Sequence, residues 1–316
     1  MLYVGLFDRG GQKLMHPNMT FAMLQTFTKM SDSNIVYEMP TPLRLAVVVA
    51  RPSKTVKTPY VADIMFADDP VVYQAHAPSL GCSGLVDVDS NVYVSGKPAT
   101  KSDAKTTHTI YGTTVYGGWR VGVNPMIANK IVRRLIEDGH AVADFGSVKT
   151  VEQEVTVGDS RIDMKVTHAD GSVSWVEVKS VPLAHYRNAA EVCKDYRAGA
   201  VPPASAPAQV QAPNKIALFP DGYRKNKTDA ISPRATKHLE NLMERVQAGD
   251  RAYCVYLCQR ADAVRFEPAA LDTIYSETFQ RAVAAGVRMR CYVVEWDKTF
   301  KAMRFVREIP VVVPAP

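Results

Sequence analysis

The chain has 316 residues and a net charge of +6, because 38 Lys and Arg outnumber 32 Asp and Glu. This length accommodates two domains, and a hydrophobic content of 47% is ordinary for a soluble globular protein. No apolar run approaches the length that spans a membrane, and no Gly-rich loop of the Walker type is present, so we expect neither membrane insertion nor ATP hydrolysis. The basic balance suits a polyanionic partner such as nucleic acid or a membrane surface, although composition alone favours a solvated basic surface.

The cysteines are sparse, with no CxxC pair and no histidine at zinc-binding spacing. Cys254 and Cys258 share one face of an apolar segment and are predicted to be buried thiols. This usage indicates a reducing compartment, and we expect a cytoplasmic location. Residues 1–40 lack a continuous signal-peptide core and are treated as an N-terminal extension to which we assign no function.

Residues 41–123 predict a small β domain. Val, Tyr, Thr and Ile are concentrated in five segments separated by Pro, Gly, Ser and Asp, namely 43–50, 60–67, 71–76, 85–95 and 109–123. This pattern fits a small barrel of the OB type, and a small sandwich fits almost as well.

Residues 124–316 predict an α/β (α+β) domain. A helix is expected over 125–138, where Ile127, Ile131 and Leu135 recur at four-residue spacing before Gly139. A second helix is expected to begin at Ser232-Pro233, and a third over 269–285. The intervening strands are expected over 141–145, 151–157, 160–167, 172–181, 252–258 and 288–294. This order indicates a mixed sheet flanked by helices, with the Ala/Pro-rich segment 198–214 as a flexible surface loop.

The most informative segments are Ser160–Asp163 and Val176–Lys179, in adjacent predicted strands. A two-residue Asp-Gly turn between them would place Asp163 opposite Val178 and mix charged with apolar side chains. A three-residue loop with Gly171 in the left-handed conformation places Asp163 opposite Glu177 and Met164 opposite Val176. The apolar alternation therefore selects the second register.

That register brings two carboxylates, Asp163 and Glu177, together with the ammonium group of Lys179. Adjacent carboxylates repel each other unless a cation neutralises them, and Mg²⁺ prefers such oxygen ligands. Lys179 could orient or help to deprotonate an attacking water. The competing interpretation is an ion-pair ladder on a strand surface, because a Glu-x-Lys pair alone is a weak signal.

The arrangement resembles the PD-(D/E)xK nuclease core, and the chain as a whole resembles the SfsA (sugar fermentation stimulation protein) family. The matching residues follow the same order over about 42 to 294, and include His76, Pro78, Gly81, Gly122, Asn124, Asn129, Glu154, Arg161, Asp163, Glu177, Lys179, Asp221, Arg234, His238, Arg260 and Asp262. The resemblance implies an OB-like domain joined to a nuclease-like domain that binds DNA with little sequence preference. It also implies Asp163 and Glu177 as ligands of Mg²⁺ or Mn²⁺, and Lys179 as the catalytic lysine.

Two departures from the family pattern concern catalysis. Ser79 and Leu80 replace Asn and Thr after the family's histidine, here His76, and Arg134 stands where the family has Glu. Glu137, one turn further along, could replace that acidic residue. His76, Glu137, Glu154 and Asp221 are therefore secondary candidates for the site.

Basic residues indicate where a phosphate backbone would lie. Arg234, Lys237 and His238 occupy the first turns of a predicted helix, where backbone N–H groups already favour phosphate, although a solvated helix face is the alternative. Arg224, in the loop 221–227, and Arg161 are further candidates for DNA binding. Trp119 could stack on bases or could pack between the two domains.

Two hypotheses follow. In the first, the chain is a sequence-tolerant DNA-binding protein with a Mg²⁺-dependent phosphodiester hydrolase site acting on single- or double-stranded DNA. In the second, it is a non-catalytic DNA-binding regulator on a nuclease-like scaffold, linked to sugar metabolism as the family's name suggests. Both place it in the cytoplasm in association with DNA.

Overall fold

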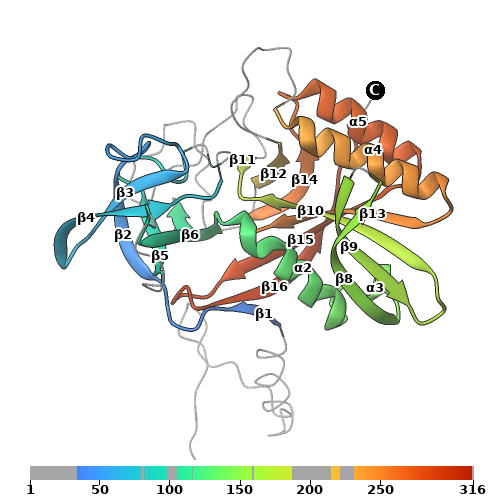
Figure 1. The fold of residues 1–316 in the computed structure, drawn as a ribbon, viewed down its shortest axis with the longest axis horizontal. Coiled ribbons are helices and arrows are strands. Elements are labelled where there is room, and N and C mark those ends of the chain that lie inside the picture. Colours follow the sequence, from blue (N-terminus) through green and yellow to red (C-terminus); the bar gives the residue numbers. More distant parts are fainter. Residues whose placement is uncertain are drawn as a thin grey trace, which may run out of the picture. The chain divides into compact units, whose positions relative to one another are not determined.

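The computed structural model describes residues 34–79, 82, 84–97, 105–115, 117–158, 160–186, 215–220 and 231–314 (Figure 1). Most of the N-terminal extension, the Ala/Pro-rich segment 198–214 and the loop 221–227, with Asp221 and Arg224, lie outside the described residues. The last part of the predicted extension forms a short strand, β1 (Ile35–Glu38), at the edge of the largest sheet.

The first large region is a β-barrel of the OB type, as the sequence predicts. Its strands are β2 (Arg44–Ala50), β3 (Val61–Phe66), β4 (Asp69–His76), β5 (Asn91–Gly96), β6 (His108–Val115) and β7 (Trp119–Gly122). They pair in the order β4-β3-β2-β5-β6-β7, and an additional pairing of β4 with β6 closes the ring. Val48, Ile64, Val92 and Ile110 fill its interior, and burial alternates along β2 and β5. Ring closure selects the barrel over the sandwich.

The second region is built on a seven-stranded mixed sheet in the order β1-β16-β15-β13-β10-β9-β8. The central strands β10, β13 and β15 are parallel, whereas β8 and β9 on one side and β16 on the other are antiparallel to their neighbours. The strand bounds are β8 (Val148–Val157), β9 (Ser160–His168), β10 (Val173–Val181), β13 (Arg251–Cys258), β15 (Arg288–Trp296) and β16 (Ala302–Ile309). A second sheet pairs β11 (Ala184–Tyr186), β12 (Lys215–Phe219) and β14 (Ala263–Pro268).

Helices cover both faces of the seven-stranded sheet. The short helix η1 (Pro125–Ile127) leads into α2 (Ala128–Glu137), whose buried side chains join Val176 and Val178 of β10 in one core. On the other face, α4 (Pro233–Gln247) and α5 (Thr273–Ala284) lie side by side and share a second core with Trp175 (Figure 1). The central strand β10 is therefore buried on both faces.

Close approaches join the barrel to the larger sheet within one compact unit, Val36–Pro316. A Cβ atom on Gly122 would meet the side chain of Gln259, whose Cβ atom would be 2.9 Å away, so a larger residue would force Gln259 to shift. The Tyr93 and Phe300 rings stack with centroids 3.6 Å apart. Trp119 packs against both the barrel core and the α4 side of the sheet, so of its two predicted roles the structure shows packing between the regions.

Several local expectations were wrong. Residues 141–145 form a short helix, α3 (Val142–Phe145), where we expected a strand. Its carboxylate Asp144 accepts hydrogen bonds from Arg290 and Tyr292, a long-range anchor that a local apolar pattern does not reveal. The predicted strand 109–123 is divided into β6 and β7 by a turn in which Gly117 and Gly118 adopt positive φ. The α5 helix begins at Thr273 because Asp272 caps it by accepting the Tyr275 N–H at 3.0 Å.

Candidate active site

The site is built on β10. Two charged side chains are buried on this strand, whose other side chains mostly belong to the hydrophobic core. Glu177 is only 3% exposed and Lys179 9% exposed, and both lie in the part of the strand next to β13. Burying ionised groups is costly unless they are paired. Here the Lys179 ammonium donates to Oε1 of Glu177 over 2.6 Å.

The β9–β10 hairpin has the predicted register. Gly171 adopts the left-handed φ of +83°, and Met164 pairs with Val176. The backbone ladder ends at that pair, one position before Asp163. Beyond that pair the N–H of Val178 donates to a side chain instead of a backbone carbonyl: its acceptor is Oδ2 of Asp163, at 2.8 Å.

Asp163 is held by neutral hydrogen-bond donors. Besides the Val178 N–H, the Asn129 amide of α2 donates to its Oδ1 over 2.9 Å. Burial and the negative charge of Glu177 raise the pKa of Asp163, and these two effects outweigh its hydrogen bonds and the more distant Lys179. Asp163 is therefore a carboxylate whose charge the protein does not fully compensate.

Glu177 has the opposite electrostatic surroundings. Burial alone would raise its pKa, but Lys179 and His238 lower the pKa of Glu177 below its ordinary value. His238 of α4 contacts Oε1 of Glu177 through Nδ1, and Lys179 Nζ lies 3.3 Å from that same nitrogen. Arg234, one turn earlier on α4, donates to Nε2 of His238 over 3.3 Å. His238 thus connects the charged pair on β10 to the basic start of α4.

The donor set fits a divalent metal that keeps water or substrate oxygens among its ligands. Asp163 and Glu177 supply hard carboxylate oxygens, and the raised pKa of Asp163 reflects a charge that a cation would neutralise. Over the described residues, no group of three or more His, Cys, Asp or Glu side chains forms a ready cage. Asp163 and Glu177 are the carboxylates of this site that could hold a divalent cation.

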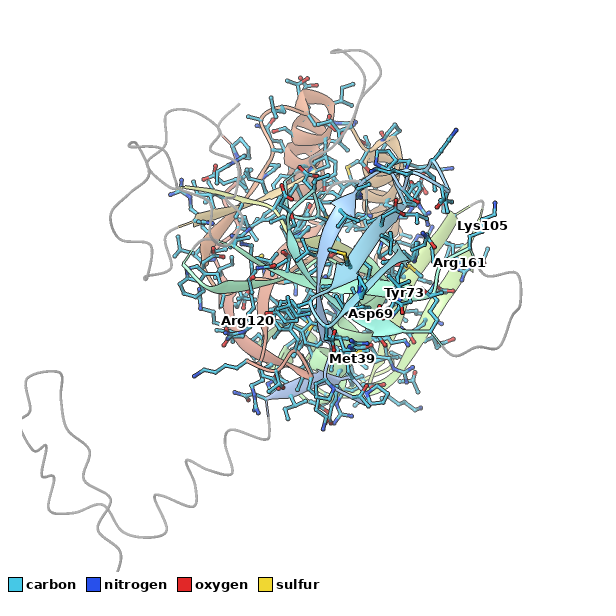
Figure 2. The ribbon with its side chains drawn as sticks, turned by 90° about the vertical axis from the view of Figure 1, so that its left-hand side faces the viewer. Met39, Asp69, Tyr73, Lys105, Arg120 and Arg161 are labelled. Carbon is cyan, nitrogen blue, oxygen red and sulfur yellow. The ribbon has the colours of Figure 1, made fainter. Side chains whose placement is uncertain are left out.

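Other predicted residues form ion pairs outside the Glu177–Lys179 pair. Arg161 forms an exposed ion pair with Glu154 across the β8–β9 hairpin, and Figure 2 shows it on the opposite side of the view from Arg120. Glu137 pairs with Arg133 at 2.7 Å on the exposed face of α2.

His76 is the last residue of β4 in the barrel, as the sequence predicts, and burial lowers its pKa. Lys237 is exposed on α4.

Two contacts were not anticipated from the sequence. Asn129 matched the family pattern, but its hydrogen bond to Asp163 was not expected. The signal available in the sequence was a polar amide in the first turn of a helix whose other face is apolar. His238 was assigned to DNA binding, whereas the structure also joins it to Glu177 and Lys179. Its signal was weak, because nothing local to α4 indicates which strand the helix covers.

Among the described residues no helix is both long and apolar enough to cross a membrane.

The family model described as "Sugar fermentation stimulation protein RE domain" matches residues 126–191 and 209–300. A sugar fermentation stimulation protein homolog of Geobacter metallireducens is 30% identical over 257 residues, covering 80% of this chain and 91% of that protein. A homolog of Paramagnetospirillum magneticum is 32% identical over 236 residues, covering 74% and 83% respectively.

The same fold occurs in a solved structure, that of Pyrococcus furiosus SfsA in complex with Ca²⁺. It has a TM-score of 0.67 at 17% identity and covers 88% of this chain and 99% of the other. Together with the family match, these findings confirm the resemblance in the sequence: the chain belongs to the sugar fermentation stimulation protein (SfsA) family.

Proposed function

We propose that this protein binds DNA with little sequence preference and hydrolyses its phosphodiester bonds with the help of Mg²⁺ or Mn²⁺. The observation that carries this proposal is the buried Glu177–Lys179 pair together with Asp163, a carboxylate whose charge is not fully compensated. A surface ion-pair ladder, the competing interpretation, requires exposed side chains, and these are buried.

Each residue has a distinct task in this proposal. Asp163 and Glu177 would hold the cation, which when bound polarises a phosphoryl oxygen and makes its water more acidic. Lys179 orients the attacking water and stabilises the negative charge that develops on the phosphate. Asn129 fixes the Asp163 carboxylate, and His238 fixes Glu177 and Lys179 relative to each other. The solved Pyrococcus furiosus relative is described in complex with Ca²⁺, and a protein of the same fold that binds a divalent cation is consistent with this proposal.

The α4 helix supplies a route for the DNA backbone toward this site. Arg234 and Lys237 are exposed in its first turns, where helix N–H groups also favour phosphate. Arg234 contacts His238, which contacts the charged pair, so phosphate bound at the helix start would lie next to the carboxylates. The net charge of +6 favours the same partner and fits a DNA-associated protein of the cytoplasm.

A second candidate function is DNA binding without cleavage, in a regulatory role connected with sugar metabolism. One observation favours it: Oε1 of Glu177 already interacts with both Lys179 and His238, so its charge is compensated without a cation. In that case the buried Glu177–Lys179 pair would stabilise the fold, and the basic start of α4 would bind DNA.

One experiment separates the two. Purified protein is incubated with labelled single- and double-stranded DNA in Mg²⁺, Mn²⁺ or EDTA, alongside Asp163→Ala and Lys179→Ala, and gel shifts at two salt concentrations report binding. We expect cleavage that requires metal and is lost in both variants while binding remains. Salt-sensitive binding without cleavage in any metal would establish the regulator, and absence of both would remove DNA as the partner.

A further inference from the structure

A pocket of about 430 Å³ opens beside Asp163 on the α2 side of the site. It is lined by Pro125, Met126, Asn129, Lys130, Gln153 and Glu154, which come from η1, the start of α2 and the middle of β8. Asn129 belongs both to the pocket wall and to the site, because its amide donates to Oδ1 of Asp163. A group bound in the pocket is therefore one side chain away from the carboxylate.

The β8 wall of the pocket has an unusual backbone. The β8–β9 ladder pairs Gln153 with Met164 and Val155 with Ile162, so Glu154 stands at the position opposite Asp163. Glu154 has a φ of +57°, a left-handed conformation that is costly for a residue with a Cβ atom. Strain of this kind persists where the surrounding structure enforces it, often at ligand-binding positions.

The lining combines an apolar platform with polar groups. Met126 is 70% exposed, although its neighbour Ile127 is buried in the core, so the methionine side chain is presented to the pocket rather than to the fold. Pro125 continues this apolar surface. Lys130 places a positive charge at the pocket wall, and the Glu154 carboxylate of the same wall is paired with Arg161. Asn129 and Gln153 contribute amides, groups that match the edges of nucleobases.

We propose that this pocket receives the unpaired base of the nucleotide next to the scissile phosphate, so that the protein prefers single-stranded DNA. This inference rests on the proposed function. The volume falls near the lower end of the roughly 300–1,000 Å³ of small-molecule sites and suits one nucleotide. Met126 and Pro125 provide the stacking surface, and Lys130 the charge for the adjoining phosphate. A paired base would first have to leave its duplex, which costs free energy and disfavours double-stranded substrate.

The test uses two readouts. The first is the fluorescence change of a trinucleotide containing 2-aminopurine when it binds in EDTA, which needs no cleavage. The second is the rate of single-strand relative to duplex cleavage in Mg²⁺ or Mn²⁺. Met126→Ala removes the stacking surface without touching the core, and Met126→Phe keeps one. Ile274→Ala, which shortens a side chain 39% exposed on α5, is the matched control.

We expect the wild-type protein, Met126→Phe and Ile274→Ala to change the 2-aminopurine signal and to prefer single strands. Met126→Ala should bind the trinucleotide about tenfold more weakly and lose most of the preference, since one stacked base contributes about 1–3 kcal/mol. If wild-type protein cleaves DNA but Met126→Ala matches it in both readouts, the pocket proposal fails while the nuclease stands. A 2-aminopurine signal that depends on Met126 without any cleavage supports the pocket and overturns the nuclease. Absence of both overturns both.

Discussion

Two buried ion clusters in this protein look alike in sequence and differ in what they can do. Glu177 and Lys179 lie two residues apart at the site, and Arg260 and Asp262 lie two residues apart after β13. In the second cluster Arg260 binds both oxygens of Asp262 at 2.6 Å, and Lys215 approaches Oδ2 at 3.2 Å. All three of its side chains are essentially inaccessible to solvent.

The difference lies in charge balance and access. Two cations surround one carboxylate in the Arg260 cluster, and although burial opposes them they lower the pKa of Asp262 to about 2. At the site, Asp163 is bound by an amide and a backbone N–H, and its pKa is raised. His238 also connects the site to the exposed start of α4. A buried charged pair alone therefore does not indicate an active site. The incompletely compensated carboxylate beside it and the connection to the exposed start of α4 are what make this site the candidate.

The largest effect should come from Lys179→Met, which keeps the length of the side chain and removes its charge. We expect single-turnover cleavage to fall by about 10²–10⁴-fold, the usual contribution of a group that assists proton transfer. Lys165→Met is the control, because Lys165 lies on β9 beside β10 and pairs only weakly with Glu152 at 3.5 Å. If wild type and Lys179→Met cleave at equal rates, and circular dichroism shows that both are folded, then Glu177 and Lys179 only stabilise the fold, as the Arg260 cluster does.

Asp262→Asn should act on stability. Removing one partner of a buried ion pair typically costs about 3–5 kcal/mol, measured here as the free energy of unfolding in urea at pH 7. Because the folded pKa of Asp262 is depressed to about 2, its stabilisation is present above the unfolded pKa of 3.8 and is lost as the pH falls from there toward 2. The difference between wild type and Asp262→Asn should therefore shrink over that interval.

The exposed Arg44–Asp68 pair supplies the control for this variant. Asp68→Asn should leave the unfolding curve nearly unchanged, because surface ion pairs contribute little. A deficit in Asp262→Asn that stays constant between pH 7 and pH 3 would show that the carboxylate charge is not what stabilises the cluster.

His238→Ala should have an intermediate effect that separates positioning from DNA contact. His238 contacts Glu177 and Lys179, so its loss should raise the Mg²⁺ concentration needed for half-maximal cleavage by about 10–100-fold, as for other residues that hold metal ligands. The Kd for DNA measured in EDTA should change little. His238→Gln, which keeps a polar group near Glu177, should recover part of the metal response. A loss confined to DNA affinity would instead assign His238 to the phosphate backbone.

The sequence predicted most where local pattern and chain geometry agree. The register of the β9–β10 hairpin followed from the alternation of Met164 and Val176 with charged residues and from Gly171, and the structure has that register. The start of α4 at Ser232-Pro233 followed from helix-capping preferences. A small barrel was one of two architectures that fitted the number and spacing of the predicted strands, and the pairing of β4 with β6 selects it over the sandwich.

The features that the sequence did not predict depend on contacts between residues that are distant in the chain. The alternation on β10 indicated a mixed face but not that α4 covers it, and this cover is what buries Glu177. The sequence likewise did not place Asn129 against Asp163, 34 positions away. Strand β16 was not predicted because its residues are a mixture of Arg, Glu and apolar types without strict alternation. Such features arise from tertiary packing, which local propensity does not encode.

The smallest expected effect concerns the start of α4, along which we propose that DNA reaches Asp163, Glu177 and Lys179. Lys237→Ala removes one exposed charge from the start of α4, so binding should weaken by a few-fold at moderate salt. The slope of log Kd against log salt concentration should decrease by about 1, because one fewer counterion is released. Lys298→Ala, in the turn between β15 and β16, is the matched control and should leave the slope unchanged. If both variants reduce it equally, DNA is attracted by the net charge of +6 as a whole, and the start of α4 has no special part in leading the backbone to Asp163.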